Sequence, residues 1–306
     1  MAQDLAGTAE LAFFGGGRAR SAPWLSASGA AGDWTTVMGG GWLDYLERLE
    51  AMLAPVGASL LARSAFRPGE RVLDVGCGLG GFSRQVAASL GQNGWLRGVD
   101  ISPAVVAEAN RRACAEGASN VAFSVADAAV CRPQLAPFGR VCSRLGTLYF
   151  DDPLAALRNL HSLLQPGGRL DLAVWAPLRD NDWAAYLMGI LRRHIDLPWE
   201  APGEPGPFSL SNTVYLRELL AAAGFRNVDI QSWQGRLVLG GPGASVAEAT
   251  QFAYRGLFID QLLRRQPVAV REAIHAQVEE LFGVHQRPIG VTMGGAVWLV
   301  SAWRPY

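Results

Sequence analysis

Apolar and polar residues alternate in blocks along the middle of the chain. Residues 71–75 form a short apolar run with β-branched side chains, which predicts a buried strand, and residues 82–90 have helical spacing. Further strand-like runs lie at 98–100, 121–127, 138–144 and 170–175. Strands that alternate with helices are typical of a parallel sheet with crossover helices. The pattern therefore predicts an α/β fold.

Helical patterns continue on both sides of this core. Residues 41–65 carry leucines at helical spacing and predict one or two helices. Ser102, Asp151 or Asp152, and Asn212 or Thr213 are predicted to begin helices, because a short polar side chain there can accept a bond from a free backbone N–H. Later segments predict an amphipathic helix at 183–195, strands at 226–233 and 296–303, and two helices within 245–283.

Two late segments, 176–211 and 234–294, are longer than connections between elements need to be. We interpret both as cap insertions over a ligand site, within one domain that spans 41–306. Residues 1–40, whose composition is dominated by small residues, are predicted to form an N-terminal arm.

A glycine-rich turn follows the first predicted strand. Gly76, Gly78 and Gly80 alternate, and Asp74 lies two residues before them. Glycine allows positive φ and lets a ligand approach the backbone closely. The first N–H groups of the next helix point at the same turn. The turn is therefore a candidate cradle for a polar cofactor, to which Asp74 adds a carboxylate.

Glycine spacing alone leaves the cofactor open. Gly76, Gly78 and Gly81 also satisfy the G-x-G-x-x-G spacing of dinucleotide-binding folds, and Asp100 suits either kind of site because both bind ribose hydroxyls there. An NAD(P)-dependent oxidoreductase is thus one hypothesis. Asp127 and the sequence Pro166-Gly167-Gly168 argue against it.

With these elements together, the chain resembles the class I S-adenosylmethionine (SAM)-dependent methyltransferases. It looks closest to the small-molecule branch that includes the ubiquinone and menaquinone C-methyltransferases. The resemblance covers roughly residues 40–175. It is carried by Asp74-Val75-Gly76-Cys77-Gly78-Leu79-Gly80, Val99-Asp100, Ala126-Asp127 and Leu164-Gln165-Pro166-Gly167-Gly168. It implies a Rossmann-like, doubly wound sheet of seven strands whose last strand runs antiparallel.

The resemblance also implies a cofactor site. The glycine loop would carry the methionine and ribose parts of SAM, Asp100 would bind the ribose hydroxyls, and Asp127 the adenine amino group. Arg144 follows the fourth predicted strand, where the family places residues that line the site, and Trp34 lies in a segment that often closes over SAM. The predicted cofactor-binding residues are Trp34, Asp74, Gly76, Cys77, Gly78, Gly80, Asp100, Ile101, Asp127, Ala128 and Arg144.

Methyl transfer from a sulfonium needs a base only when the acceptor must lose a proton. Of the four histidines, His194 continues the apolar side of the predicted helix at 183–195 and is the candidate base. His161 lies on the apolar side of its own helix, where a packed structural role is expected. His275 is expected at the surface, and His285 lies in a segment that could reach the mouth of the site.

The acceptor is expected to be an apolar or aromatic small molecule, methylated at O, N or C. Trp175, Trp183 and Trp199 could build an apolar pocket for it, although core packing explains each of them singly. Natural-product tailoring fits such a pocket. The product of the cofactor would be S-adenosylhomocysteine. A protein that binds SAM without transferring methyl is a further hypothesis.

Charge and composition exclude several other functions and kinds of site. The formal net charge is zero and no basic run occurs, which argues against a nucleic-acid surface. The basic residues are all Arg, so a Lys Schiff base is excluded, and the bias suggests a high-GC bacterium. The four cysteines form no C-x-x-C pair, and neither a metal site nor a disulfide framework is indicated. Without a membrane span or secretory signal in the sequence, we expect a soluble cytoplasmic protein.

Overall fold

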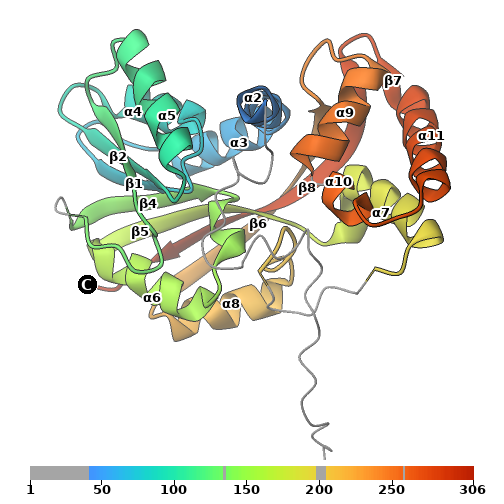
Figure 1. Ribbon diagram of the computed structural model, residues 1–306. Coiled ribbons are helices and arrows are strands. Elements are labelled where there is room, and N and C mark those ends of the chain that lie inside the picture. Colours follow the sequence, from blue (N-terminus) through green and yellow to red (C-terminus); the bar gives the residue numbers. More distant parts are fainter. Residues whose placement is uncertain (1–40, 134–135, 198–204, 258) are drawn as a thin grey trace, which may run out of the picture.

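An eight-stranded sheet organises the protein (Figure 1). The computed structural model describes residues 41–133, 136–197, 205–257 and 259–306. The strands are β1 (Arg71–Val75), β2 (Trp95–Asp100), β3 (Val121–Val125), β4 (Phe138–Arg144), β5 (Leu164–Trp175), β6 (Arg226–Leu239), β7 (Gln286–Arg287) and β8 (Gly290–Trp303). Their order is β3-β2-β1-β4-β5-β8-β6, and β7 pairs with β8.

Strand direction confirms the predicted fold class. β1 to β5 are parallel, whereas β8 runs antiparallel to both β5 and β6. The predicted sheet of seven strands with an antiparallel last strand is therefore the main path of the observed sheet. The two-residue β7 is an additional strand that the sequence did not indicate. The predicted arm at 1–40, with Trp34, lies outside the described residues, as does Trp199.

Helices cover both faces of the sheet. On one face lie α3 (Ala54–Ser64), α4 (Gly81–Leu90) and α5 (Pro103–Ala115), with α2 (Trp42–Met52) beside them (Figure 1). On the other face lie α6 (Pro153–Leu163) and α8 (Thr213–Ala222). The predicted caps are observed: Ser102, Asp152 and Asn212 accept bonds from backbone N–H groups in the first turns of α5, α6 and α8.

β6 and β8 extend beyond the rest of the sheet. Pairing of β5 with β8 ends at Trp175 opposite Val297, whereas β6 and β8 remain paired as far as Leu239 opposite Val291. This two-stranded ribbon leads to α9 (Val246–Gly256), α10 (Ile259–Leu263) and α11 (Val268–His285), and α11 packs on α7 (Asp182–His194) (Figure 1). The α7 helix and the described residues of 234–294 thus form a helical body, called the cap below, carried mainly by the ribbon. The described end of the first predicted insertion instead packs on the core, where Ser209 Oγ donates to the Leu148 carbonyl at 2.8 Å.

Both ribbon strands are longer than predicted. The sequence indicated strands at 226–233 and 296–303, but β6 continues to Leu239 and β8 begins at Gly290. Gly235 pairs with Gly295 where the ribbon leaves the sheet. Glycines in a strand interrupt the apolar alternation on which strand prediction depends, which explains the difference.

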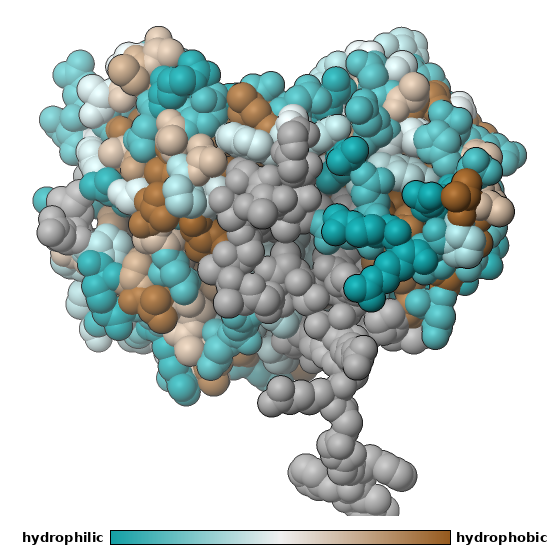
Figure 2. All heavy atoms as spheres, viewed as in Figure 1, coloured by the Kyte–Doolittle hydropathy of each residue, from teal (hydrophilic) through white to brown (hydrophobic). Residues whose placement is uncertain are grey.

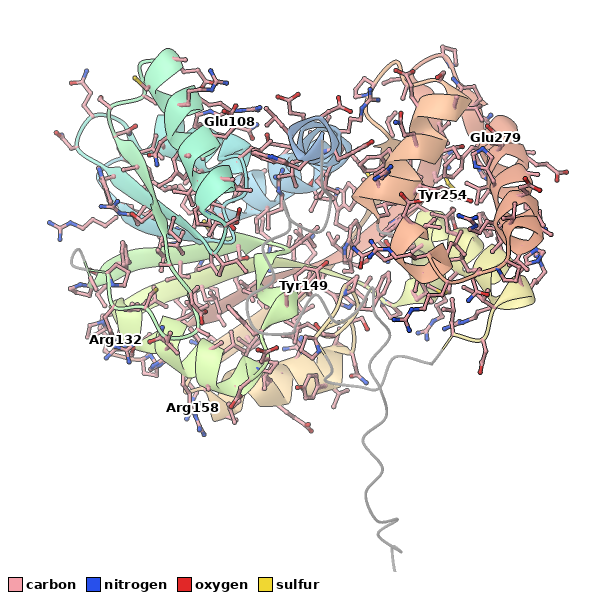
Figure 3. All side chains as sticks on the ribbon, in the orientation of Figure 1. Glu108, Arg132, Tyr149, Arg158, Tyr254 and Glu279 are labelled. Atoms are coloured by element: carbon pink, nitrogen blue, oxygen red, sulfur yellow. The ribbon has the colours of Figure 1, made fainter. Side chains whose placement is uncertain are left out.

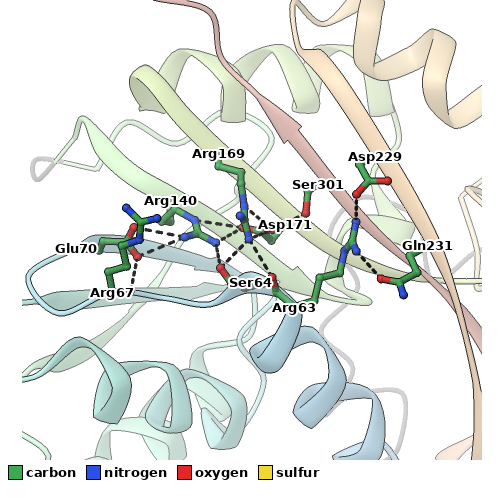
Figure 4. A network of polar contacts seen from close by, with 10 residues as sticks. All are labelled: Arg63, Ser64, Arg67, Glu70, Arg140, Arg169, Asp171, Asp229, Gln231 and Ser301. Carbon is green, nitrogen blue, oxygen red and sulfur yellow. Dashed lines mark hydrogen bonds and ion pairs between the residues drawn. The ribbon is translucent and has the colours of Figure 1, made fainter.

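The far end of α3 is fixed to the sheet by buried charges (Figure 4). Arg140 Nη2 and Arg169 Nη2 each donate to the Ser64 carbonyl at 2.7 Å, and both guanidinium groups also bind Asp171. Asp171 is fully buried and accepts from a third partner, Ser301 Oγ, at 2.8 Å. This network holds β4, β5, β8 and α3 together away from the glycine loop.

Hydrophilic side chains dominate the cap on the face shown in Figure 2, so the apolar sides of its helices turn mainly inward. Phe252 of α9 and Ile274, Val278 and Phe282 of α11 are fully buried. None of the helices in the described ranges combines the length and apolarity that crossing a bilayer requires.

Candidate functional site

A cavity of about 530 Å³ lies at the carboxyl ends of the parallel strands, between the core and the cap. This is the position where open α/β sheets bind ligands. Its wall combines the turn after β1, the ends of β2, β3 and β4, one side of α2 and the inner side of the cap. Tyr149, which Figure 3 labels at the end of the 3₁₀ helix η1 (Gly146–Tyr149), also lines it.

The glycine loop has positive φ at three alternating positions, but for different reasons. A Cβ on Gly76 would lie 2.7 Å from Gly146 Cα, and one on Gly80 would lie 2.5 Å from the Phe123 ring. A Cβ on Gly78 would have no neighbour within 4 Å. Gly76 and Gly80 are therefore required by packing. Gly78 instead borders open space in the cavity, as a cofactor cradle requires.

Asp100 ends β2 and holds the glycine loop in place. Its Oδ2 accepts a bond from the Gly78 N–H at 3.1 Å, and its Oδ1 accepts one from the Ser102 N–H at 3.1 Å. Asp100 lines the cavity, and a carboxylate oxygen can accept more than one bond, so its bonds to the backbone are compatible with a bond from a ligand. Ile101, the next residue, also lines the cavity.

Asp127 follows β3 and lies at the exposed rim of the same cavity. Its Oδ1 accepts a bond from the Ala129 N–H at 2.8 Å, which fixes the carboxylate within a tight turn. The neighbouring Ala128 is buried and lines the cavity, as does Cys77. The structure thus brings together the ends of β1, β2 and β3 as the sequence predicted.

Asp74 and Gly80 were predicted to contact cofactor, but the structure places neither in the cavity wall. The Asp74 side chain is buried under the loop, where Ser83 Oγ donates to its Oδ2 at 2.5 Å. Burial raises the pKa of Asp74 to about 6, against the opposing bond from Ser83. Asp74 therefore supports the junction of β1 and α4, and Gly80 makes room for Phe123.

Arg144 lines the cavity and is joined there by Glu50, which sequence reasoning missed. Arg144 Nη2 lies 3.7 Å from Glu50 Oε1, and that oxygen also accepts the Gly81 N–H at 2.8 Å. Burial lowers the pKa of Arg144, while the charge of Glu50 opposes this shift. A signal existed in the sequence, because Glu50 stands among Leu46, Leu49 and Leu53 on the apolar side of its helix.

The cap side of the cavity is apolar and aromatic. The Trp175 and Trp183 rings have centroids 5.2 Å apart, and the Trp183 and Phe208 rings 6.5 Å apart. The aliphatic part of this wall comes mostly from α7 and α10, through Leu187, Met188, Leu191, Ile259 and Leu262. Trp175 and Trp183 both line the cavity and are also buried, at 5% and 8% exposure.

The structure does not bring the predicted base to the cavity. His194 lies in the last turn of α7, beyond the lining residue Leu191, and its Nε2 is 2.6 Å from Gln277 Nε2 on α11. His275 and His285 are also not among the lining residues. His161 packs edge-on against Phe225 at 5.0 Å, and burial lowers its pKa. The packed role expected for His161 is what the structure shows.

Comparison with known proteins agrees with this geometry. Residues 72–168 match the family model described as a methyltransferase domain. Aklanonic acid methyltransferase DauC of Streptomyces sp. (strain C5) is 33% identical over 116 residues, which are 38% of this chain and 53% of that protein. Phosphoethanolamine N-methyltransferase 2 of Caenorhabditis elegans is 33% identical over 110 residues, 36% of this chain and 25% of that protein. The chain thus spans about half or less of the length of these two relatives.

Solved structures show the same fold. Phosphoethanolamine N-methyltransferase 2 of Haemonchus contortus with SAM superposes with a TM-score of 0.55 at 16% identity, over 90% of this chain and 60% of that one. The YcgJ protein of Bacillus subtilis has a TM-score of 0.53 at 19% identity, over 82% and 99%. Residues 72–168 therefore match a methyltransferase domain, and the fold around them is the Rossmann-like fold of these solved structures.

Proposed function

We propose that this protein is a SAM-dependent methyltransferase that acts on O, N or C of an apolar or aromatic small molecule. One observation carries the proposal: a single cavity joins the glycine loop and its acidic neighbours to an apolar, aromatic wall in the cap. The match of residues 72–168 to a methyltransferase domain supports the cofactor half of this proposal. The cap wall supports the acceptor half.

The residues present fit SAM. The open space at Gly78 admits the ligand close to the backbone, and Asp100 offers carboxylate oxygens to ribose hydroxyls. Ile101, Asp127 and Ala128 line the same cavity, and they would hold the adenine. When bound, SAM supplies a methyl group already activated by the sulfonium. The protein must then hold the acceptor in line with that methyl and exclude water.

The apolar half of the cavity is suited to that task. Trp175, Trp183 and Phe208 line the same cavity as the glycine loop, and a wall of aromatic side chains favours an apolar or aromatic acceptor. His194 is not placed to take a proton from such an acceptor, so no proton step is assigned to it.

The relative named for aklanonic acid, a natural product, supports a role in natural-product tailoring. The resemblance to ubiquinone and menaquinone C-methyltransferases stays a prediction, as does the division into an arm at 1–40 and a capped domain at 41–306.

Ligand binding followed by turnover tests the proposal. Calorimetric titration should show binding of SAM and S-adenosylhomocysteine and no binding of NAD, whereas an oxidoreductase would show the reverse. Incubation with methyl-labelled SAM and a panel of hydroxylated and carbonyl-bearing aromatic compounds should yield a labelled product and S-adenosylhomocysteine. Binding of SAM without transfer to any acceptor would favour a SAM-binding protein that is not an enzyme.

A further inference from the structure

Glu50 and Arg144 form an ion pair at the glycine-loop end of the cavity. Glu50 belongs to α2 and Arg144 ends β4, and both line the cavity together with Gly76, Cys77 and Gly78. Figure 1 shows α2 between the core helices and α9, so Glu50 reaches the site from a helix outside the matched domain at 72–168. A pair of opposite charges is thus presented to a ligand on the loop.

Two glycines make space for this pair. A Cβ on Gly81 would overlap the Glu50 carboxylate, and one on Gly57 would lie 3.2 Å from Arg144 Nη1. The Arg144 guanidinium also lies 5.8 Å from the centroid of the Phe82 ring, which limits its movement. The Gly81 N–H anchors Glu50, and Arg144 lies between Glu50 and the Phe82 ring.

Glu50 and Arg144 are too far apart to form a hydrogen bond with each other. The 3.7 Å between Arg144 Nη2 and Glu50 Oε1 exceeds a hydrogen bond, so the two ions attract without sharing a proton. A lone anion would be attracted by Arg144 and repelled by Glu50, and a lone cation the reverse. A group that carries both charges a few ångströms apart is complementary to both residues.

We propose that Glu50 and Arg144 recognise the α-amino and α-carboxylate groups of the methionyl part of SAM. Glu50 accepts from the ammonium, and Arg144 donates to the carboxylate. The assignment rests on the proposed function. It makes α2 part of the cofactor site, and it identifies Glu50 as a residue that selects ligands with an amino acid group over those with adenosine alone.

A structural role for Glu50 is the rival explanation. The N-cap of α4 is Gly80, which has no side chain, and Glu50 Oε1 binds the Gly81 N–H at the start of that helix. Glu50 could thus act on the ligand only through the loop. Glu50→Gln separates the two roles, because the amide oxygen can still accept from Gly81 while the negative charge is lost.

The experiment compares two ligands on three proteins. S-adenosylhomocysteine carries the amino acid group, whereas 5′-methylthioadenosine keeps adenosine and sulfur without it. Calorimetry measures both ligands with wild type, Glu50→Gln and Glu47→Gln. Glu47 lies on the same helix, is about half exposed and pairs with Arg112, so it is the matched control. Thermal unfolding verifies that each variant is folded.

We expect Glu50→Gln to weaken the binding of S-adenosylhomocysteine about tenfold to a hundredfold and to leave the affinity for 5′-methylthioadenosine unchanged. Glu47→Gln should leave the affinity for both ligands unchanged. Equal weakening of both ligands, or no change in either, would overturn the assignment of Glu50. If wild type binds neither ligand, the proposed function itself fails, and that result differs visibly from a failure confined to Glu50.

Discussion

The backbone N–H of Gly78 donates to Asp100 Oδ2 at 3.1 Å, which ties the most open glycine of the loop to the end of the neighbouring strand. β1 and β2 pair in parallel with Val75 opposite Val99, so the two strands end side by side. The same carboxylate that would bind a ribose therefore also sets the shape of the surface on which the ligand lies. Recognition and loop geometry are coupled through one residue.

This coupling gives the first prediction, for Asp100→Asn. An amide cannot accept through both of its terminal atoms, so one of the bonds from Gly78 or Ser102 is lost together with the charge. We expect S-adenosylhomocysteine to bind more weakly by about 1–3 kcal/mol, as measured by calorimetry. Asp44→Asn, at an exposed carboxylate on α2, is the control and should bind normally. Unchanged affinity in Asp100→Asn would remove this carboxylate from the site.

The second prediction concerns Gly78→Val. The branched side chain would occupy the open space at φ +54 and resist that backbone conformation, so the cavity loses room where the ligand lies. Gly69→Val is matched, because Gly69 also has positive φ and no neighbour within 4 Å but does not line the cavity. Both variants should lose some stability in thermal unfolding. Only Gly78→Val should lose binding of S-adenosylhomocysteine. Normal binding by that variant would contradict the prediction that the cofactor lies against the backbone at Gly78.

Local patterns explain why much of the site could be predicted. The glycine loop, Asp100 and Asp127 each lie within a few residues of a strand end, so sequence order alone brings them to one edge of a parallel sheet. Which way a side chain faces depends on packing across the sheet. Asp74 turns under the loop to Ser83, and Gly80 serves Phe123, although both stand in the same motif as Gly78.

Contacts between distant segments were harder to predict. Glu50 reaches the site from a helix that carries no motif, and only its position among leucines marks it. His194 is a suitable residue type on a helix that lines the cavity. However, it lies about one turn beyond the lining residue Leu191, where it contacts Gln277 instead. The ribbon of β6 and β8 was underestimated because Gly235 and Gly295 interrupt its alternation.

The third prediction is a pH dependence from Asp74. Burial raises the pKa of this carboxyl from 3.8 to about 6, so between these values the folded protein holds a proton that the unfolded chain has released. The free energy of unfolding should therefore fall as the pH rises from about 3 to about 7, by roughly 3 kcal/mol in total from this group. Urea unfolding of wild type and Asp74→Asn across this range measures the difference. Parallel curves for the two proteins would show that Asp74 does not titrate there.

The fourth prediction tests the buried charges of Figure 4. Asp171→Asn leaves Arg140 and Arg169 without their buried counter-charge and should cost about 3–5 kcal/mol of unfolding free energy. The control is Asp229→Asn, because Asp229 pairs with Arg63 but is 65% exposed, and we expect it to cost at most about 1 kcal/mol. Denaturant unfolding gives both values. Similar losses in the two variants would mean that burial does not strengthen this network.

The last prediction concerns the cap wall. Leu187 on α7 is 5% exposed and lines the cavity, whereas the adjacent Tyr186 is 47% exposed and its ring lies 5.8 Å from His285. Leu187→Trp should fill the acceptor half without reaching the glycine loop. It should therefore reduce binding of the aromatic probe 1-anilinonaphthalene-8-sulfonate, followed by its fluorescence, and leave S-adenosylhomocysteine affinity unchanged.

Tyr186→Trp adds an indole to the same helix on its outer side and is the matched control for Leu187→Trp. It should leave the affinity for both the probe and S-adenosylhomocysteine unchanged, because this position lies outside the cavity wall. If Leu187→Trp weakened the binding of S-adenosylhomocysteine as much as that of the probe, the cofactor would instead lie against α7. The cavity would then not divide into a cofactor half at the loop and an acceptor half at the cap, since one ligand would span both.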